Sequence, residues 1–565
     1  MLKLQSRNQF ATLLDAAVLA GADDGRHAII FVATDREPVF VSRRAFRQQV
    51  DAYANSLRRA GIRPRDLVVI AHTQNLESIY AFWGALRIGA IPSMFPTLTE
   101  KLDPDIYRQN MAELVRLSGA RAILTSDDFA PALQTGVDCP VYGSAQVNGE
   151  DTAAPPPTYA PHPDEIAFLQ HSSGTTGLQK GVALSHTAVL NQLASYSDAI
   201  QLTGEDVVVS WLPLYHDMGL IAGFLLPLVQ GIPLVLMSPF DWVQHPALLL
   251  RAIDQFGGTL CWLPNFAYNH CARRIRKRDK AGLSLASMRL FINCSEPVRH
   301  DSHELFLAKF REQGVRPEML AVSYAMAENT FAVTQTEPGQ PARLDVVDRR
   351  ALAEDRAAIP VARDDPQALV QVSCGRPVAG TAVRVLDEQG GELAERQVGE
   401  LAVRSNCMLT EYYRRPDLRP FQDGWYLTGD MGYVAEGELY VIGRAKDLII
   451  NAGKNIYPQD IEAIVNNVPG VHAGRAVAFG VPDEREGTEL IAVVAEVQTD
   501  DPAARQEIGR RIRQAVAQQS LVTVSYVHLV GPKWLIKTSS GKIARAANRE
   551  KWLKERLEIS GISNL

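Results

Sequence analysis

The stretch Ile166–His186, IAFLQHSSGTTGLQKGVALSH, predicts a strand, then a loop of Ser, Thr and Gly, then a helix that begins near His186. Small hydroxylated residues and glycines allow a backbone to approach a polyphosphate closely, and their N–H and O–H groups can donate to its oxygens. Lys180 adds a positive charge at the end of the loop. The candidate phosphate-binding residues are Ser172, Ser173, Gly174, Thr175, Thr176, Gly177 and Lys180.

This loop is not a Walker loop. The pattern GxxxxGK[ST] would require glycine at position 179, where the sequence has Gln179. The composition of the loop also fits an ordinary turn between two elements. Motifs elsewhere in the chain are therefore needed to distinguish a phosphate-binding loop from such a turn.

Outside the loop, short β-rich runs alternate with helical stretches, which predicts α/β layers with largely parallel sheets. From about Ala382 the pattern changes to strands separated by the turn residues Gly390 and Gly391, as expected of antiparallel hairpins. Another α/β pattern follows Gly443, and a charged helix is expected over roughly 544–557. The β-rich runs are Leu67–Ala71, Ala122–Thr125, Val207–Trp211 and Leu234–Met237.

A chain of 565 residues exceeds the usual size of one domain, so at least two are expected. We predict a large N-terminal domain of layered α/β sheets with a β-rich subdomain over residues 1–445. A small α+β domain is predicted over residues 446–565. The stretch Pro338–Asp365, rich in Pro, Ala, Asp and Arg, is the one whose order is least certain from composition.

Net charge and cysteine spacing argue against some classes of partner and of site. The 58 basic and 64 acidic residues give a net charge of −6, which argues against nucleic acid as the main partner. The six cysteines form no CxxC pair, so neither a disulfide framework nor a zinc site is indicated, and a cytoplasmic location is expected.

One segment raises the question of a membrane span. Gly219–Met237 carries no charge over 19 residues, close to the length that crosses a bilayer. Pro227 and Pro233 interrupt it, together with Gly231, and proline disrupts helix interiors. A buried helix, a tight turn and a buried strand are therefore favoured over a span, and the N-terminus lacks the apolar run of a signal peptide.

Seven motifs in order show that the chain resembles the adenylate-forming superfamily, which includes acyl-CoA synthetases, luciferases and fatty acyl-AMP ligases. The resemblance extends over about residues 160–545. The motifs are SSGTTGLQKG (172–181), WLPLYHDMG (211–219), NCSEPVR (293–299), SYAMAE (323–328), GWYLTGD (424–430), GRAKDLI (443–449) and KTSSGK (537–542).

The resemblance implies a two-step reaction with ATP and Mg²⁺. A carboxylate attacks the α-phosphate of ATP to give acyl-AMP and pyrophosphate, and a thiol then displaces AMP. No covalent enzyme intermediate is implied, so positioning and charge stabilisation would carry catalysis.

The resemblance also implies roles for single residues. Ser295, Glu296, Pro297 and Tyr324 would form the adenine site, with Asp430 and Arg444 at the ribose and Glu328 at Mg²⁺. Lys542 would be the catalytic lysine, His216 the residue between nucleotide and acyl channel, and Lys446 the hinge of a mobile C-terminal domain. Two positions depart from the family pattern, which usually has Pro at Gln179 and Gly at Ala325.

Several features resemble the fatty acyl-AMP ligases, which transfer the acyl group to an acyl carrier protein. Ala327 replaces the usual Thr, and CWLPNFAYN (261–269) is similar to a segment beside that subgroup's acyl tunnel. From Glu328 to Gly375 is 375 − 328 = 47 positions, long enough for the subgroup's insertion. The expected substrate is a fatty or related carboxylic acid, and the acceptor would be a separate carrier protein.

Alternatives stay open from the sequence. The enzyme could be an acyl-CoA or aryl-CoA ligase, or a nucleotide-binding homologue without catalysis. The apolar residues near the motifs could line an acyl pocket or be plain core. They are Phe224, Leu225, Leu226, Trp262, Leu263 and Phe266. The basic run Arg273–Lys280 could dock an acidic partner or be a solvated helix end.

Overall fold

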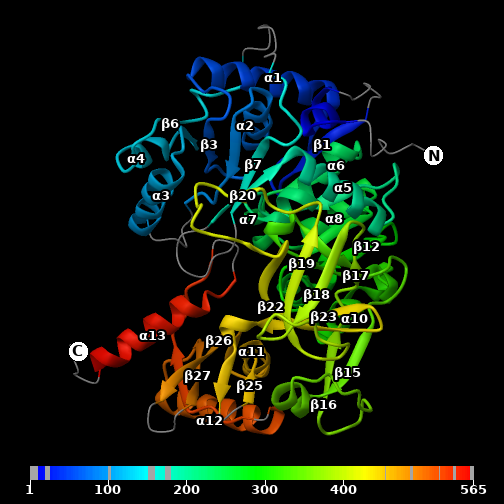
Figure 1. Ribbon diagram of the computed structural model, residues 1–565, viewed down its shortest axis with the longest axis vertical. Coiled ribbons are helices and arrows are strands. Elements are labelled where there is room, and N and C mark those ends of the chain that lie inside the picture. Colours follow the sequence, from blue (N-terminus) through cyan, green and yellow to red (C-terminus); the bar gives the residue numbers. More distant parts are fainter. Residues whose placement is uncertain are drawn as a thin grey trace.

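The computed structural model places two large sheets side by side in the upper part of the molecule, and smaller β-layers below them (Figure 1). Residues 10–19, 26–98, 104–150, 159–171, 180–451, 454–483, 488–520, 522–538 and 542–559 are described. The six residues Ser172–Gly177 of the predicted phosphate loop lie outside these ranges.

The first large sheet has nine strands in the order β17-β14-β13-β12-β11-β9-β10-β1-β2. Its six central strands are parallel, and β2, β14 and β17 pair antiparallel at its ends. The strands are β1 His27–Val32, β2 Val39–Ser42, β9 Val208–Ser210, β10 Leu234–Met237, β11 Leu260–Leu263, β12 Leu290–Asn293, β13 Leu320–Ala325, β14 Ala332–Gln335 and β17 Arg376–Pro377.

The second sheet has seven strands in the order β20-β8-β7-β4-β3-β5-β6. Strands β7 and β8 are antiparallel and are joined by the phosphate loop, so the loop begins and ends at the same edge. The strands are β3 Leu67–Ile70, β4 Ile91–Met94, β5 Ala122–Leu124, β6 Val141–Tyr142, β7 Ile166–His171, β8 Gly181–Ser185 and β20 Glu411–Tyr412.

Helices connect and cover these parallel strands, as the alternating pattern predicted. Ser42 and Ser185 cap two of them, because each side-chain oxygen accepts a backbone N–H of the first turn. The helices are α1 Arg43–Arg59, α2 Leu76–Arg87, α3 Pro104–Ser118, α4 Ala130–Gln134, α5 His186–Ala199, α6 Leu226–Gln230, α7 Pro239–Gln244, α8 Ala247–Phe256, α9 Asn265–Arg274 and α10 His300–Phe310.

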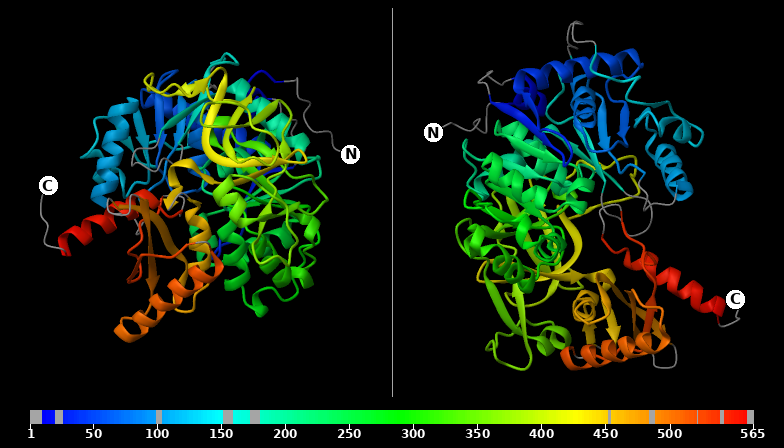
Figure 2. Two further views of the ribbon diagram at one scale, coloured as in Figure 1. Left: turned by 60° about the horizontal axis from the view of Figure 1, so that its bottom comes forward. Right: turned by 180° about the vertical axis from the view of Figure 1, so that it is seen from behind.

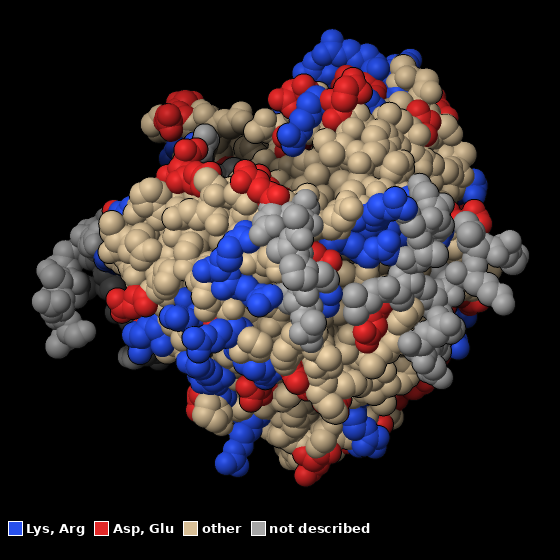
Figure 3. Space-filling model, turned by 90° about the horizontal axis from the view of Figure 1, so that it is seen from above, with Lys and Arg blue, Asp and Glu red and all other residues tan. Residues whose placement is uncertain are grey.

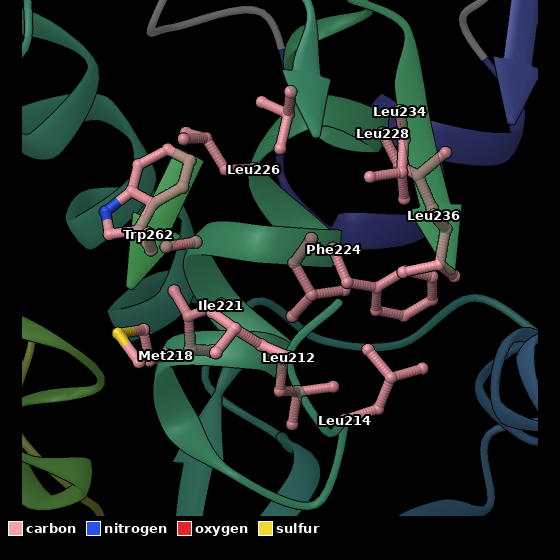
Figure 4. Packing of buried hydrophobic residues seen from close by; sticks show 14 of the residues in the cluster. Leu212, Leu214, Met218, Ile221, Phe224, Leu226, Leu228, Leu234, Leu236 and Trp262 are labelled. Atoms are coloured by element: carbon pink, nitrogen blue, oxygen red, sulfur yellow. The ribbon is translucent and has the colours of Figure 1, made fainter. Parts of the chain in front are cut away.

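The uncharged stretch Gly219–Met237 is part of the core. It forms a π-type helix over Met218–Leu225, then α6, a left-handed turn at Gly231 and strand β10, and all of these residues except Gln230 are buried. Figure 4 shows its side chains packed together, with Ile221 and Phe224 near Leu212. The helix, turn and strand interpretation is confirmed, and no helix among the described residues is both long and apolar enough to cross a membrane.

The antiparallel layer predicted after Ala382 is a sheet with the order β18-β19-β22-β21 and β23 beside β22. The turn between β22 and β23 has two residues, Glu436 (φ 54°) and Gly437 (φ 74°), the geometry that matches strand twist. The strands are β18 Thr381–Leu386, β19 Gly399–Ser405, β21 Phe421–Gln422, β22 Trp425–Ala435 and β23 Glu438–Arg444.

The stretch of uncertain order before this layer is structured. It forms the antiparallel hairpin of β15 (Leu344–Asp348) and β16 (Ala368–Val372), with a short helix over Ala351–Asp355 between them. The hairpin projects beside the last part of the chain in Figure 1.

The chain after Ile449 forms a separate lobe with its own apolar core, seen at the bottom of Figure 1 and from behind in Figure 2. Its charged last helix runs from Arg545 to Ile559, close to the predicted 544–557. The elements are β24 Ile449–Asn451, β25 Lys454–Ile456, α11 Pro458–Asn466, β26 Val471–Asp483, β27 Thr488–Val497, α12 Pro502–Gln519, β28 Tyr526–Val530 and α13 Arg545–Ile559.

These layers confirm the predicted fold class of α/β sheets with a β-rich subdomain. On the face shown in Figure 3, acidic side chains lie among the basic ones, as the near balance of charge would lead one to expect.

Candidate functional site

A Tyr–Asp–Arg group, in which the tyrosine and the aspartate are buried and the arginine is partly exposed, lies where the first large sheet meets the antiparallel layer. Asp430 on β22 and Arg444 on β23 are cross-strand partners, and Arg444 Nε donates to Asp430 Oδ1 at 3.0 Å. Tyr324, from β13, donates its hydroxyl to Asp430 Oδ2 at 2.6 Å. The predicted adenine and ribose residues therefore form one hydrogen-bonded group.

The local backbone fixes Asp430 in this group. Gly429 has a φ of 71°, a conformation that a side chain would disfavour, and Thr428 Oγ1 accepts the N–H of Asp430 at 3.0 Å. Burial and the adjacent Asp430 raise the pKa of Tyr324 well above its usual value, so its hydroxyl keeps the proton that it donates. Each carboxylate oxygen of Asp430 accepts one bond here and has a second lone pair for a ligand hydroxyl.

Glu328 lies on the single turn that follows β13, and its carboxylate belongs to a second polar group. Tyr412 donates to Glu328 Oε1 at 2.9 Å, and its hydroxyl lies 3.0 Å from that of Tyr426. The Lys180 ammonium lies 4.8 Å from the centre of the Tyr412 ring. The predicted metal residue and the last phosphate-loop residue thus share one aromatic neighbour.

The ends of the phosphate loop are held by backbone pairing. His171, the last residue of β7, pairs with Gly181, the first of β8, so the loop leaves and re-enters the sheet at adjacent positions. Strand β8 was not predicted, because the residues before His186 were expected to belong to the loop. Its buried residues Val182, Ala183 and Leu184 show the apolar run that could have revealed it.

His216 and Lys542 approach the site from opposite lobes. His216 Nδ1 lies 2.6 Å from Asp217 Oδ1, which also accepts the N–H of Met218 at 2.7 Å and begins the π-type helix. Burial alone would raise the pKa of the Asp217 carboxyl, but His216 and then Lys542 lower it, and the net shift is downward. Lys542 is therefore one of the charges that act on the buried Asp217 carboxyl.

Lys542 is positioned by the local backbone. Its carbonyl accepts the N–H of Thr538 at 2.7 Å, and a bridge pairs Lys537 with Ile543. A small hairpin from the C-terminal lobe therefore presents the lysine.

Ser295 and Glu296, two of the predicted adenine residues, each contact a residue distant in sequence. Ser295 has a φ of 70°, an uncommon value for a residue other than glycine, and its hydroxyl lies 3.8 Å from Met218 Sδ. Glu296 Oε2 accepts the backbone N–H of Phe266 at 2.9 Å. Pro297 follows in an exposed position.

Lys446 lies in the single turn Ala445–Asp447, between the antiparallel layer and the C-terminal lobe. The next residue, Asp447, accepts from Arg545 at 2.6 Å, and Arg545 also pairs with Glu462 at 2.9 Å. The predicted hinge residue is therefore next to a group of ion pairs, which links the connection between the two domains to the C-terminal lobe.

No group of three or more His, Cys, Asp or Glu suited to hold a metal occurs among the described residues. A Mg²⁺ ion that bridges phosphates needs only one or two protein carboxylates, so the single carboxylate of Glu328 fits such an ion.

The apolar residues near the motifs are mostly core. Phe224, Leu225, Leu226, Trp262 and Leu263 are fully buried, which supports the core interpretation for these five (Figure 4). Phe266 differs, because 39% of it is exposed beside Glu296. The sequence did not distinguish it from the others.

Three residues with contacts at the candidate site were not predicted from the sequence, namely Tyr412, Tyr426 and Arg545. Tyr412 is 84 positions from Glu328, and the residues around it, EYYRR (411–415), match no motif that would predict the contact. Only the pairing of β20 with β8 brings it to the site.

Comparison with known proteins gives consistent results. The model of the AMP-binding enzyme family matches residues 20–413. The medium-chain-fatty-acid–[acyl-carrier-protein] ligase JamA of Moorena producens is 31% identical, over 98% of this chain and 97% of that protein. The long-chain-fatty-acid–AMP ligase FadD26 of Mycobacterium tuberculosis is 30% identical, over 90% of this chain and 91% of that protein.

Two solved structures share the fold over nearly the whole length. One, from a study of fatty acyl-adenylate ligases from E. coli and L. pneumophila, has a TM-score of 0.88 and 28% identity and covers 99% of this chain and 100% of that chain. A fatty acyl-adenylate ligase from L. pneumophila in complex with acyl adenylate and pyrophosphate has a TM-score of 0.75 and 29% identity, with 97% and 98% coverage.

Proposed function

Because the chain belongs to the AMP-binding enzyme family, we propose that it uses ATP to convert a fatty or related carboxylic acid to acyl-AMP with release of pyrophosphate. In a second step it transfers the acyl group to the phosphopantetheine thiol of a separate acyl carrier protein. The observation that carries this proposal is the hydrogen-bonded group of Tyr324, Asp430 and Arg444. The charge of Lys542, which helps to lower the pKa of Asp217, agrees with it.

The Tyr–Asp–Arg group would bind the nucleoside. The free lone pairs of Asp430 would accept the two ribose hydroxyls, and charge-assisted bonds of this kind are among the stronger ones in proteins. The adenine would lie between the ring of Tyr324 and the wall of Ser295, Glu296 and Pro297. Since Glu296 already accepts the N–H of Phe266, its role is to hold that wall in place.

The polyphosphate would lie between the loop Ser172–Gly177 and Lys180. Lys180 supplies positive charge there, and Glu328 would hold Mg²⁺ beside it through its second carboxylate oxygen. When bound, the ion neutralises phosphate charge. The 2.9 Å hydrogen bond from Tyr412 to one carboxylate oxygen of Glu328 would leave the second oxygen free for the ion.

Lys542 would act at the reacting atoms. One oxygen of the substrate carboxylate attacks the α-phosphorus, and the bond from that phosphorus to the oxygen that bridges it to the β-phosphate breaks. The ammonium of Lys542 would neutralise the charge that builds on the oxygens of the α-phosphate and on the attacking carboxylate. Asp217 fixes the ring of His216 beside them. The thiol then attacks the acyl carbon, and AMP leaves with the former carboxylate oxygen.

The 31% identity to the acyl-carrier-protein ligase JamA supports a carrier protein as acceptor. Contacts between the β15–β16 hairpin and the C-terminal lobe do not distinguish the two acceptors, but they restrain the lobe. Glu354, in the hairpin's short helix, pairs with Lys454 at 3.0 Å, and Asn455 donates to the carbonyl of Ala353 at 3.1 Å. Arg349 bonds the carbonyl of Gln519. These contacts would oppose rotation of residues 446–565 about Lys446, the motion that thiol transfer needs.

The basic run does not support a carrier-binding surface. Arg273 and Arg274 end α9, where cations are favoured by the helix dipole. Arg273 and Arg274 follow Phe266 by seven and eight residues of α9, which places them about 10–12 Å from it along the helix. The solvated helix end is therefore the better interpretation, and the carrier would bind elsewhere.

We also propose a cytoplasmic location, because the six cysteines are free and buried, as suits a reducing compartment.

The test is product analysis by mass spectrometry with ATP, Mg²⁺ and a panel of fatty and aromatic acids. Parallel reactions contain coenzyme A or a phosphopantetheinylated carrier protein. We expect acyl-AMP in all reactions with an active acid, acyl-carrier product with the carrier, and little acyl-CoA.

Lys542→Ala should lose acyl-AMP formation by about 10²- to 10³-fold, as for removal of one charge-stabilising donor. Lys537→Ala, in the same hairpin, is the matched control and should retain activity. Rapid formation of acyl-CoA would replace the carrier-protein proposal with a CoA ligase, and unchanged activity of Lys542→Ala would refute the mechanism.

A further inference from the structure

The hairpin that presents Lys542 is held by one fully buried amide side chain. Asn548, in the first turn of α13, has an exposed fraction of 0%. Its Oδ1 accepts the backbone N–H of Ile536 at 2.8 Å, and its Nδ2 donates to the carbonyls of Ile536 and Ala544, both at 2.8 Å. Both N–H donors and the acceptor oxygen of this amide are therefore used where the hairpin joins the helix.

These bonds fix both arms of the hairpin at its base. The N–H of Ala544 donates to the carbonyl of Ile536 at 3.1 Å, and farther out the N–H of Thr538 donates to the carbonyl of Lys542 at 2.7 Å. Lys542 is thus two residues from the arm that Asn548 holds. Because Ile536 is 39% exposed, burial of its side chain does little to fix the other arm, and the amide bonds carry that task.

Helix α13 is itself anchored to the body of the C-terminal lobe. Arg545, its first residue, donates to the Glu462 carboxylate at 2.9 Å. One turn beyond Asn548, the Trp552 ring lies 5.6 Å from the ring of Phe479 on β26. Asn548 therefore joins the hairpin to a helix whose position is set by the lobe.

We propose that Asn548 is a positioning residue, whose three hydrogen bonds hold the hairpin so that the Lys542 ammonium reaches the reacting atoms during acyl-AMP formation. This inference rests on the proposed function and adds to it a residue outside the seven motifs. Since the Asn548 side chain is fully buried, it would act on the reaction only through Lys542. A general role in the stability of the lobe would instead affect acyl-AMP formation and acyl transfer alike.

The first test separates the two half-reactions in Asn548→Leu, which removes the three bonds and keeps a side chain of similar size. In pyrophosphate exchange with octanoic acid, kcat should fall about 10- to 100-fold, because a displacement of about 1 Å can cost 10²-fold in rate. The KM values for ATP and acid should change less than about threefold, since the lysine acts in the transition state. Transfer from synthetic octanoyl-AMP to a phosphopantetheinylated carrier protein should stay within about threefold of wild type.

The second test combines Asn548→Leu with Lys542→Ala. If Asn548 acts through Lys542, the double variant should form acyl-AMP as fast as Lys542→Ala alone, because residues that act as a unit are not additive. A further loss of about tenfold or more in the double variant would show an independent role and would overturn the inference.

Ile512→Ala is the matched control. Ile512 is also fully buried in the C-terminal lobe, but it belongs to a different apolar cluster from Leu535, which precedes the hairpin. This control should lower the midpoint of thermal unfolding and leave the ratio of acyl-AMP formation to acyl transfer unchanged.

Asn548→Asp keeps the inference testable if Asn548→Leu does not fold. An ionised carboxylate would face the two carbonyl oxygens without a donor, so kcat for acyl-AMP formation should fall while transfer is retained. Protonation restores one O–H donor, and burial favours the neutral carboxyl, so the loss relative to wild type should be smaller at pH 6 than at pH 8.

Wild-type kcat in folded Asn548→Leu and in Asn548→Asp would overturn the inference, as would equal losses of acyl-AMP formation and acyl transfer. Full activity of Lys542→Ala would instead overturn the mechanism of the proposed function, so the two failures are distinguishable.

Discussion

Removal of the Asp430 carboxylate gives a prediction whose size can be worked from the structure. Asp430→Ala deletes the acceptor of the Tyr324 and Arg444 bonds and the two proposed bonds to the ribose hydroxyls. Hydrogen bonds to a charged group contribute about 1.5–3 kcal/mol each. Loss of the two ribose bonds therefore costs about 3–6 kcal/mol, which lowers kcat/KM for ATP by about 10²- to 10⁴-fold.

The chain contains a matched control for this change. Asp345 accepts from Tyr433 and from Arg396, both at 2.9 Å, and like Asp430 it is 8% exposed. This second Tyr–Asp–Arg group belongs to the β15–β16 hairpin region, away from the residues assigned to ATP. Asp345→Ala should therefore cost comparable stability and leave kcat/KM for ATP within a few fold of wild type.

Pyrophosphate exchange at a saturating acid concentration measures kcat/KM for ATP, and the midpoint of thermal unfolding measures stability. Equal losses of kcat/KM in the two variants would show that Asp430 acts only through folding. An Asp430→Ala enzyme with normal kcat/KM would refute the nucleoside site itself.

Further predictions concern the metal, the hinge region and pH. Glu328→Gln should raise the Mg²⁺ concentration for half-maximal activity at least about tenfold, since even outer-shell changes cost 10- to 100-fold; an unchanged Mg²⁺ titration would exclude Glu328 as a ligand. Glu354→Ala removes the 3.0 Å pair with Lys454 and should increase acyl-CoA formation relative to acyl-AMP, measured by mass spectrometry; no increase would show that the hairpin contacts do not oppose transfer to CoA. Burial lowers the pKa of His171, His186 and His303 to about 4, below the 6.5 of an exposed histidine. The unfolded chain then binds more protons between about pH 6.5 and 4, so stability should fall as pH is lowered through that window; a denaturation midpoint that is the same at pH 7 and pH 5 would contradict these shifts.

The sequence predicted the order of the layers because strand and helix periodicities are local. The Gly219–Met237 stretch shows this, since its prolines and Gly231 fall where the helix, turn and strand meet. Strand β8 was missed because its five residues are too few to separate a short apolar run from a loop.

Resemblance predicts roles for residues inside motifs, but it does not predict the contacts that they make. The Tyr324–Asp430 bond joins positions 106 apart, and the Tyr412–Glu328 bond joins positions 84 apart, so neither is set by local sequence. Phe266 and Trp262 likewise looked equivalent in sequence. Only packing shows that Trp262 is fully buried and that Phe266 is 39% exposed.

The central claim is that the acid's own oxygen attacks the α-phosphate, and isotope transfer tests it most directly. The enzyme is incubated with ATP, Mg²⁺, a carrier protein and octanoic acid labelled with ¹⁸O in its carboxylate, and AMP and pyrophosphate are analysed by mass spectrometry. We expect one ¹⁸O atom in AMP and none in pyrophosphate. Unlabelled AMP, or label in pyrophosphate, would contradict formation of an acyl-adenylate at this site.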